Sequence, residues 1–414
     1  MASNPLSIST KFATSIFFLV GTFTAEGSDL RREILKKAAI SSGLTRPEET
    51  HHPVKNRLFE LGKLIFESKL VSPGEDVSCS SCHIDKFGSA DGLKNAVGIG
   101  GVGQGIERLD SKGRIVPRNT LPFWGRGGIG FNTFFWDGKV SVSSEGLTSQ
   151  FGQEAPSTDP LVISAMLPPV EVDEMVGDVG HITRETVDAA NILYKAAVER
   201  LADDKAIASA AKTAFGKEAN ELEFLNFAEA IAAFIRENFK IKETRFHSFV
   251  FSSGAFTDAE VAGGLIFYGK GQCSQCHNGP YFSDLDFHAI PSPNTAFGKN
   301  GFGVDYGRFN VTLNPEDLGK FRTPPLYNVV DTSPYGHSGA YRYLEQVILA
   351  HSDPLAVLPS SALSTSQRHD LYSQLRAWSQ EPVSQSILTK TELSNLISFL
   401  NTLNYKSAVE VNSD

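Results

Sequence analysis

Every cysteine of this chain lies in one of two copies of the motif Cys-x-x-Cys-His. One copy spans residues 79–83 and the other spans residues 273–277 of the 414-residue chain. In such a motif two thiols can bond to the vinyl groups of a haem, and the adjacent histidine can ligate its iron. The sequence therefore predicts two covalent c-type haems, held by Cys79, Cys82, His83, Cys273, Cys276 and His277.

Two other chemistries use paired cysteines, and both fit this chain less well. A zinc site takes thiolate ligands, but its two halves usually lie a few tens of residues apart, whereas these motifs lie in opposite halves of the chain. A redox-active dithiol usually accompanies a βαβ pattern, and neither motif is flanked by one. Neither alternative requires a histidine directly after the second cysteine.

Charge and the amino terminus indicate location and partners. The formal net charge of -9 disfavours nucleic acid and anionic membranes as partners, and it suits a basic electron-transfer protein. Lys11 precedes an apolar run over residues 12–23, and small residues surround Ala25. This pattern is typical of a secretory signal over residues 1–25, so we expect a periplasmic protein. An uncleaved anchor is the alternative, although the run is short for a membrane span.

The chain also contains an internal duplication. Residues 62–66 precede the first haem motif and residues 263–267 precede the second, and both segments have the apolar spacing of a helix. Two further pairs of segments resemble each other, 117–120 with 321–324 and 135–138 with 336–339. We therefore expect a mainly α fold with few strands, in which two cytochrome c-like domains each carry a haem and long loops cover the cofactors.

The expected domain boundaries follow this duplication. Residues 26–215 would form the amino-terminal haem domain, and residues 216–382 would form the carboxy-terminal one. Residues 88–132 are rich in glycine and lack a regular period, which is typical of long loops. Residues 383–414 would add a last helix and a tail. Capping boxes mark the start of the second motif's helix and of this last helix, at Thr257–Glu260 and Thr389–Glu392.

Other motifs accompany the two haem motifs in a fixed order. They are Arg118-Asn119-Thr120, Phe135-Trp136-Asp137-Gly138, Asp173-Glu174-Met175, Phe321-Arg322-Thr323-Pro324 and Pro334-Tyr335-Gly336-His337-Ser338-Gly339. With this set the chain resembles the bacterial di-haem cytochrome c peroxidases and, within that superfamily, the MauG-like enzymes, over residues 53–404. The resemblance implies a peroxidatic haem in the first domain and an electron-transfer haem in the second. It also implies that the final helix packs back on the first domain.

The resemblance implies that the first haem is open on one side. Family members that rest with two histidine ligands carry the second histidine in a glycine-rich loop after the first motif, and Ile99 occupies that position here. Isoleucine cannot ligate iron, so we expect the sixth position to be accessible to hydrogen peroxide, as in the MauG-like branch. Three histidines elsewhere in the sequence could still fill it: His51, His181 and His288.

Peroxide activation needs a group that moves a proton between two oxygen atoms. The resemblance assigns this role to Glu174, which precedes Met175, and it places a distal proline at Pro168. Ser164 occupies a position where family members often carry glutamine, so one distal hydrogen-bond donor is replaced. Glu171 is a competing proton carrier, and a solvated carboxylate in an acidic loop is the alternative interpretation of Glu174.

The resemblance places the sixth ligand of the second haem at His351. This ligand is methionine in typical peroxidases and tyrosine in MauG. A haem held by His277 and His351 would be low-spin, closed to peroxide and of lower potential than a methionine-ligated haem. We expect it to store or pass one electron. The alternative is that His351 is only a polar residue at the end of a helix over residues 344–350.

An electron relay and a calcium ion are also implied between the two haems. Trp136 occupies the family's inter-haem tryptophan position, and Trp124 is a weaker candidate. A packing role is the alternative for either indole. The calcium ligands would be the Asn119 side chain and the carbonyl oxygens of Thr332 and Pro334, which are donors of the kind that calcium prefers.

The sequence thus predicts an exported di-haem oxidoreductase that acts on hydrogen peroxide. Its redox partner would be a small cytochrome or, as in MauG-like chemistry, a protein substrate. The competing interpretation is a di-haem cytochrome that only transfers electrons. An open first haem favours the enzyme, whereas a second histidine ligand on that haem favours the carrier.

Overall fold

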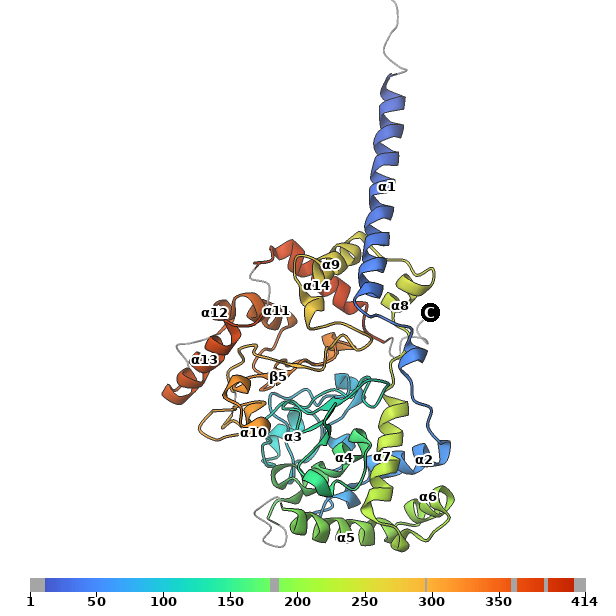
Figure 1. Ribbon diagram of the computed structural model, residues 1–414, viewed down its shortest axis with the longest axis vertical. Coiled ribbons are helices and arrows are strands. Elements are labelled where there is room, and N and C mark those ends of the chain that lie inside the picture. Colours follow the sequence, from blue (N-terminus) through green and yellow to red (C-terminus); the bar gives the residue numbers. More distant parts are fainter. Residues whose placement is uncertain (1–11, 179–185, 295, 359–362, 383–385, 406–414) are drawn as a thin grey trace, which may run out of the picture.

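The computed structural model describes residues 12–178, 186–294, 296–358, 363–382 and 386–405. The helices in this part of the chain are α1 (Phe12–Ser41), α2 (Asn56–Glu67), α3 (Ile106–Asp110), α4 (Pro160–Met166), α5 (Val187–Asp203), α6 (Lys205–Phe215), α7 (Phe224–Asn238), α8 (Arg245–Phe251), α9 (Asp258–Tyr268), α10 (Phe309–Thr312), α11 (Leu344–Ser352), α12 (Pro354–Val357), α13 (Thr365–Trp378) and α14 (Lys390–Asn401). The strands are β1 (Thr133–Phe134), β2 (Val140–Ser143), β3 (Gly146–Thr148), β4 (Phe287–His288) and β5 (Phe321–Arg322). The expected mainly α fold with few strands is confirmed (Figure 1).

Capping boxes start α9 and α14 where the sequence predicts them. At α9 the Glu260 amide donates to Thr257 Oγ1 at 3.3 Å, and the Thr257 amide donates to Glu260 Oε2 at 2.8 Å. At α14 the same two bonds join Thr389 and Glu392, at 3.3 and 2.9 Å. Each box satisfies two backbone donors that a helix start would otherwise leave unpaired.

Two helix pairs repeat the same close packing. α2 crosses α7, and α9 crosses α14. At the first crossing a Cβ atom on Gly62 would lie 1.9 Å from the carbonyl oxygen of Ala230. At the second crossing a Cβ atom on Gly263 would lie 1.9 Å from the carbonyl oxygen of Asn395. Since only glycine permits such an approach, the duplication around residues 62–66 and 263–267 extends to the helices packed against them.

This packing differs from the expected domain assignment. The boundary at residue 215 assigns α7 to the second domain, yet α7 packs on α2, beside the first haem motif. α14 packs on α9 rather than on the first domain. Tyr405, just after α14, does reach the first half, where its ring lies 4.6 Å from that of Trp124. The packing differs from the expected domains because each repeat includes a second helix. α7 covers the apolar face of α2, and α14 covers that of α9.

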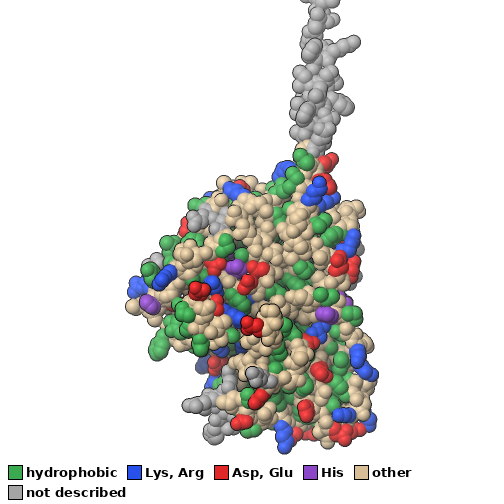
Figure 2. Space-filling view, viewed as in Figure 1, with side chains coloured by type: hydrophobic (Ala, Val, Ile, Leu, Met, Phe, Trp, Pro, Cys, Tyr) green, Lys and Arg blue, Asp and Glu red, His purple; other side chains and the backbone are tan. Residues whose placement is uncertain are grey.

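α1 projects from the body of the molecule (Figure 1). Its carboxy-terminal part packs on α9 through Leu35 and Ala39, which are both fully buried. The predicted cleavage position near Ala25 lies within α1, ahead of these packing residues. Among the residues described, no helix combines the length and the apolar character needed to cross a membrane. Figure 2 shows acidic and basic side chains intermixed over one face of the body.

An aromatic cluster connects the core to the first haem motif. The ring of Phe66, at the end of α2, lies 4.8 Å from that of Phe234 on α7 and 6.1 Å from that of Phe123. Phe123 in turn stacks on the His83 imidazole at 3.6 Å. The predicted proximal histidine is therefore positioned by the packed core.

The two small sheets are joined beside Trp136. β1, β2 and β3 form an antiparallel sheet in that order, and the tight connection between β1 and β2 carries Trp136. β4 and β5 form a second antiparallel pair, in which Phe287 pairs with Arg322. The Arg322 amide donates to the Trp136 carbonyl at 2.8 Å. A backbone hydrogen bond thus connects the two halves at the predicted relay residue.

Candidate haem sites

Both Cys-x-x-Cys-His motifs adopt the same local structure. Each opens with a short 3-10 turn, at Cys79–Ser81 and at Cys273–Gln275. The His83 amide donates to the Cys79 carbonyl at 3.0 Å, and the His277 amide donates to the Cys273 carbonyl at 2.8 Å. The turn therefore holds two thiols and an imidazole in one compact unit, as covalent haem attachment requires.

The thiols are in an environment that disfavours a redox dithiol. None of the four cysteines forms a disulfide. Burial raises the pKa to about 12 for three of the thiols, those of Cys79, Cys82 and Cys273. Since a redox-active cysteine needs a lowered pKa and an accessible thiolate, these groups suit attachment of a buried cofactor better.

The three predicted iron-ligating histidines present the same ring nitrogen. In each, Nδ1 bonds to a backbone carbonyl, His83 to Ser89 at 2.9 Å, His277 to Phe282 at 2.9 Å and His351 to Val347 at 2.7 Å. A carbonyl only accepts, so Nδ1 carries the hydrogen and the Nε2 lone pair is available to a metal. Burial lowers the pKa of His83 to about 3 and that of His277 to about 4, which keeps both rings neutral.

The second motif and His351 lie on opposite sides of one cavity. The ring centroids of His277 and His351 are 6.4 Å apart, and both residues line the cavity together with Cys273 and Cys276. Two imidazoles that ligate one metal ion from opposite sides, through bonds of about 2 Å, place their centroids roughly 6 Å apart. The residues present therefore fit a haem iron between the two rings.

Apolar side chains from three helices form much of the wall of this second cavity. Those lining residues are Phe267 of α9, Leu344, Val347 and Ile348 of α11, and Leu396 and Leu400 of α14. The cavity also includes Trp136, Asn119, Thr332 and Pro334. An apolar wall suits the faces of a porphyrin, and the predicted relay and calcium residues all border the same space.

Trp136 is held in a single orientation at the edge of the second cavity. Its Nε1 donates to the Asn119 carbonyl at 2.8 Å, and its ring lies 6.5 Å from the imidazole of His337. Trp124, the weaker candidate, donates instead to the Gly88 carbonyl at 3.0 Å and does not line this cavity. The structure therefore separates the two indoles and places only Trp136 next to the second cavity.

The three predicted calcium ligands lie together at the border of the cavity. The Asn119 side-chain amide donates to the carbonyl of Pro334 at 2.6 Å and to that of Gly336 at 3.3 Å. Thr332 lines the same space. In this rotamer the amide nitrogen faces the carbonyls, whereas calcium requires oxygen donors. Calcium binding would need the Asn119 amide turned over, and the ion stays a prediction.

Near the first motif, the Ile99 loop touches the turn that carries Glu174. Glu174 lies in the π-helical turn Val172–Val176. A Cβ atom on Gly98 would lie 2.6 Å from the Glu174 carbonyl oxygen, so the loop and the turn are in close backbone contact. The Ile99 side chain packs against Gly177, just after the turn. The isoleucine at the family's ligand position is therefore adjacent to the predicted proton carrier.

A buried arginine that sequence reasoning misses fixes this loop. Arg108 is 2% exposed. Its guanidinium donates to three carbonyls around Ile99, those of Val97 at 2.6 Å, Gly98 at 2.8 Å and Gly101 at 2.7 Å. An arginine in a glycine-rich stretch is ordinarily exposed, so the sequence carries no pattern that would identify it.

Glu171 and Glu174 have different surroundings. Glu171 is buried and ion-paired with Lys139, and Lys299 Nζ lies 4.0 Å from its other oxygen. Burial lowers the pKa of Lys139, but the negative charges of Glu171, Asp137 and Glu174 outweigh burial and raise it. Burial is the main cause of the raised pKa of Cys79, and the negative charge of Glu174 raises that pKa further. Glu174 is therefore close to the first motif, while Glu171 has a structural partner.

The remaining distal residues lie on the segment before this turn. Pro168 opens a 3-10 turn, and its carbonyl accepts the Glu171 amide at 3.1 Å. The Ser164 hydroxyl donates to the Pro160 carbonyl within α4 at 2.7 Å. Ser164 thus bonds to its own helix and does not reproduce the hydrogen bond that a glutamine would offer.

The alternative histidines for the first haem are engaged elsewhere or lie outside the described residues. His51 Nε2 lies 3.1 Å from a carboxylate oxygen of Glu237. His288 lies between Asp284 at 2.8 Å and Glu381 at 2.9 Å, beside the second motif. His181 belongs to the segment that the structure does not describe.

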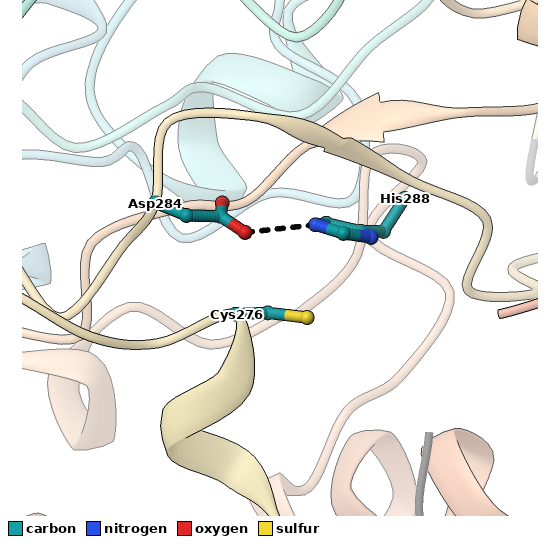
Figure 3. Close-up of side chains that lie close together, drawn as sticks. All are labelled: Cys276, Asp284 and His288. Carbon is teal, nitrogen blue, oxygen red and sulfur yellow. Dashed lines mark hydrogen bonds and ion pairs between the residues drawn. The ribbon is translucent and has the colours of Figure 1, made fainter. Parts of the chain in front are cut away.

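His288 also lies close to Cys276 and Asp284 (Figure 3). The three groups are near enough to share a metal ion. However, both His288 nitrogens already face carboxylates, and Cys276 is the predicted attachment point of a haem. Burial lowers the pKa of His288, but its partners, Asp284 first, outweigh burial and raise it. We therefore interpret the group as a charged structural unit beside the second motif.

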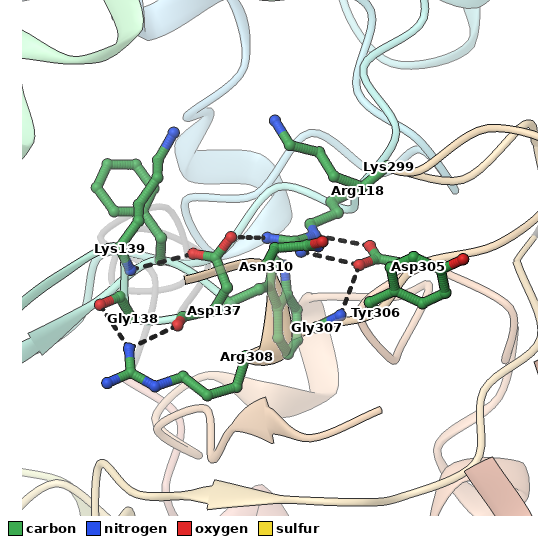
Figure 4. A network of polar contacts seen from close by, with 12 residues as sticks. Arg118, Asp137, Gly138, Lys139, Lys299, Asp305, Tyr306, Gly307, Arg308 and Asn310 are labelled. Carbon is green, nitrogen blue, oxygen red and sulfur yellow. Dashed lines mark hydrogen bonds and ion pairs between the residues drawn. The ribbon is translucent and has the colours of Figure 1, made fainter. Parts of the chain in front are cut away.

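A buried ionic network ties the Trp136 turn to the second half (Figure 4). Arg118 donates to Asp137 at 2.6 Å and to both oxygens of Asp305, at 2.7 and 2.9 Å. Arg308 donates to the carbonyls of Asp137 and Gly138 at 2.9 and 2.8 Å. Because Asp137 follows Trp136 directly, these bonds fix the predicted relay residue between the two halves.

Known proteins that resemble this chain are di-haem peroxidases and MauG proteins. The family model described as di-haem cytochrome c peroxidase matches residues 56–253. The methylamine utilization protein MauG of Methylorubrum extorquens is 27% identical over 361 residues, which cover 83% of this chain and 86% of that protein. Cytochrome c551 peroxidase of Pseudomonas aeruginosa is 27% identical over 303 residues, 72% of each protein.

Solved structures share the same fold. A MauG-like protein associated with microbial copper homeostasis superposes with a TM-score of 0.63 at 23% identity, over 87% of this chain and 92% of that one. The diheme peroxidase BthA of Burkholderia thailandensis has a TM-score of 0.63 at 17% identity, over 87% and 89%. Over most of its length the chain is thus similar to the di-haem cytochrome c peroxidases and to MauG. It is accordingly a di-haem oxidoreductase.

Proposed function

We propose that this oxidoreductase is exported to the periplasm, uses hydrogen peroxide at its first haem site and passes electrons through its second. The first haem would be held by Cys79, Cys82 and His83, and the second by Cys273, Cys276, His277 and His351. Haem supplies an iron that reacts where an axial position is open and carries single electrons where both axial positions are filled.

One contrast carries the proposal. In the second half His351 lies across a cavity from the proximal histidine, at 6.4 Å between ring centroids. In the first half the family's ligand position holds Ile99, whose side chain packs against Gly177. A hydrocarbon side chain cannot ligate iron. The two sites thus support different chemistry, reactive in the first half and closed in the second.

Glu174 is the proposed proton carrier of the first site. Its turn contacts the Ile99 loop, and its charge acts on the nearby Cys79 thiol. A carboxylate in this place can accept a proton from one oxygen of peroxide and return it to the other, which typically contributes ~10²–10⁴-fold to a rate. Pro168 would shape the same side with an apolar ring that offers no competing donor.

Trp136 is the proposed route between the sites. Its indole is fixed by the Asn119 carbonyl, and it borders the second cavity. The reductant would be a small cytochrome or a residue of a protein substrate. Asn119, Thr332 and Pro334 would bind calcium once the Asn119 amide is turned, and the ion would strengthen the junction between the halves.

Optical and EPR spectra of the resting ferric protein test this proposal. We expect one high-spin haem and one low-spin haem with two histidine ligands, and a spectral change on addition of hydrogen peroxide. Two low-spin haems that do not respond to peroxide would contradict the proposal. That result would support the competing function, a di-haem cytochrome that only transfers electrons.

A further inference from the structure

Two buried arginines near the predicted haem sites form no ion pair with any of the described residues. Arg322, in β5, is 1% exposed, and neither Nη1 nor Nη2 has a hydrogen-bond partner among the described residues. Arg126 is 6% exposed, and its Nε has no partner either. Neither side chain forms an ion pair within the described part of the chain. Because buried charges are almost always paired, both guanidinium groups call for an anion.

The position of Arg322 indicates where that anion belongs. Arg322 lines the second cavity. Its Nε donates to the Phe135 carbonyl at 3.0 Å, and its guanidinium lies 5.5 Å from the centre of the Phe131 ring. Its backbone amide is bonded to the Trp136 carbonyl. The side chain therefore extends from the second cavity toward the first half, alongside the proposed relay.

Arg126 lies beside the first motif. Its guanidinium lies 4.5 Å from the centre of the Phe123 ring, which stacks on His83. Arg126 does not line the second cavity, so Arg322 alone indicates an anion there.

The carboxylates around this place are committed to other partners. Asp284 accepts hydrogen bonds from His288 and from the Asp286 amide. Asp137 and Asp305 are paired with Arg118. The charge of Asp284 acts on Arg322, but within the described residues no carboxylate forms an ion pair with either arginine. A haem carries two propionate carboxylates, and the haem of the second site has to occupy the cavity that Arg322 lines.

We infer that Arg322 binds a propionate carboxylate of the second haem. This inference rests on the proposed second haem, between His277 and His351. It orients that haem with its carboxylate edge toward Trp136 and the first half. A buried cation also favours the reduced form of a neighbouring haem, so Arg322 would offset part of the lowering of potential that a second histidine ligand causes.

Redox titration of each haem in Arg322→Gln tests the inference. The midpoint potential of the second haem is expected to fall, because the variant loses the cation that favours the added electron. The potential should also become more dependent on pH, since a propionate without its cation binds a proton more readily. Arg322→Lys should restore part of the shift.

Arg376→Gln is the matched control, because it removes the same charge from an exposed position on α13. Thioether bonds keep the haem attached in every variant, and an unchanged low-spin spectrum shows that the second site is still folded. A second-haem potential in Arg322→Gln equal to that of Arg376→Gln at every pH would overturn the inference.

Titration of the unmutated protein with chloride and phosphate adds a second test. If either anion shifts the second-haem potential and Arg322→Gln abolishes that response, an exchangeable anion occupies the site and the inference is wrong. If neither anion shifts the second-haem potential, the result supports a propionate carboxylate that belongs to the covalently attached haem. A purified protein without a second covalent haem would overturn the proposed function as well, so the two failures are distinguishable.

Discussion

The two halves of this molecule share one scaffold and differ at the predicted sixth-ligand position. In both, a glycine allows two helices to touch, at Gly62 and Gly263, and the predicted proximal imidazole donates to a backbone carbonyl at 2.9 Å. α11 places His351 opposite His277, whereas in the first half the predicted position holds Ile99, whose side chain packs against Gly177. The scaffold around the motifs is therefore repeated, and the difference lies in segments outside the repeat.

The polar groups around the two motifs extend this contrast. Beside the first motif is a turn with Glu174, next to the buried ion pair of Glu171 and Lys139. Beside the second motif is His288, held between two carboxylates. A carboxylate beside an open position can exchange protons with a ligand, whereas a fully bonded imidazolium has a fixed charge. These surroundings agree with the proposed division of roles, acid–base chemistry in the first half and electron transfer in the second.

Removing the first haem should have the largest effect on this comparison. In Cys79→Ala combined with Cys82→Ala, the covalent bonds of the first haem cannot form, so the reaction with peroxide should disappear. The low-spin spectrum of the second haem should remain, because its ligands lie in the other half. Mass spectrometry after acid–acetone extraction should show one haem in place of two. Undiminished peroxide reactivity would show that the roles of the halves are reversed.

His351→Ala should make the second site resemble the first. Without the second imidazole, we expect the second haem to become high-spin or water-ligated, and EPR measures this change directly. His369→Ala is a suitable control, because His369 is exposed on α13. An unchanged low-spin signal in His351→Ala would show that another residue ligates that iron.

Glu174→Gln and Glu171→Gln should separate chemistry from stability within the first half. Glu174→Gln should keep both resting spectra and slow the reaction with peroxide at least about tenfold, because the amide cannot carry the proton. Glu171→Gln should instead lower the free energy of unfolding by roughly 3–5 kcal/mol, since it leaves Lys139 buried without its partner. Stopped-flow spectroscopy and thermal unfolding measure the two effects. If Glu171→Gln were fully stable but reacted more slowly with peroxide, Glu171 would be the proton carrier and Glu174 would not.

The sequence predicts those parts of the site whose contacts join residues that are close together along the chain. Each haem motif is five consecutive residues, and its turn closes through hydrogen bonds within that stretch. His351 could be predicted because it lies in the same continuous segment as the motif ending at Gly339. The capping boxes of α9 and α14 are local for the same reason.

The features that sequence reasoning misses depend on contacts between distant segments. The pairing of α14 with α9 differs from the expected packing on the first domain, because an apolar helix face does not reveal which surface it covers. Arg108 and Arg322 are arginines that the fold buries, whereas sequence alone predicts exposure for this residue type. Arg108 is identified by its three carbonyl acceptors, and Arg322 by guanidinium nitrogens that have no partner among the described residues. Both signals can be read only from the three-dimensional structure.

Trp136→Phe should have the smallest effect and gives the sharpest test of how the halves communicate. Phenylalanine preserves much of the packing but is far harder to oxidise than indole. The variant loses one hydrogen bond, to the Asn119 carbonyl, which is worth ~0.5–1.5 kcal/mol. Trp124→Phe loses an equivalent bond, to the Gly88 carbonyl, and Trp124 does not line the second cavity. Each variant therefore loses one comparable hydrogen bond, and only Trp136 borders the second cavity.

Stopped-flow spectra after a single addition of peroxide can follow both haems in these two variants. The first haem should react at the unmutated rate in each, since His83 and Glu174 are unchanged. The second haem should respond more slowly in Trp136→Phe and normally in Trp124→Phe. Equal rates in both variants would mean that Trp136 serves packing alone. Arg322, which is bonded to Trp136 and Phe135 at the same junction, would then be the next residue to test for the path between the two halves.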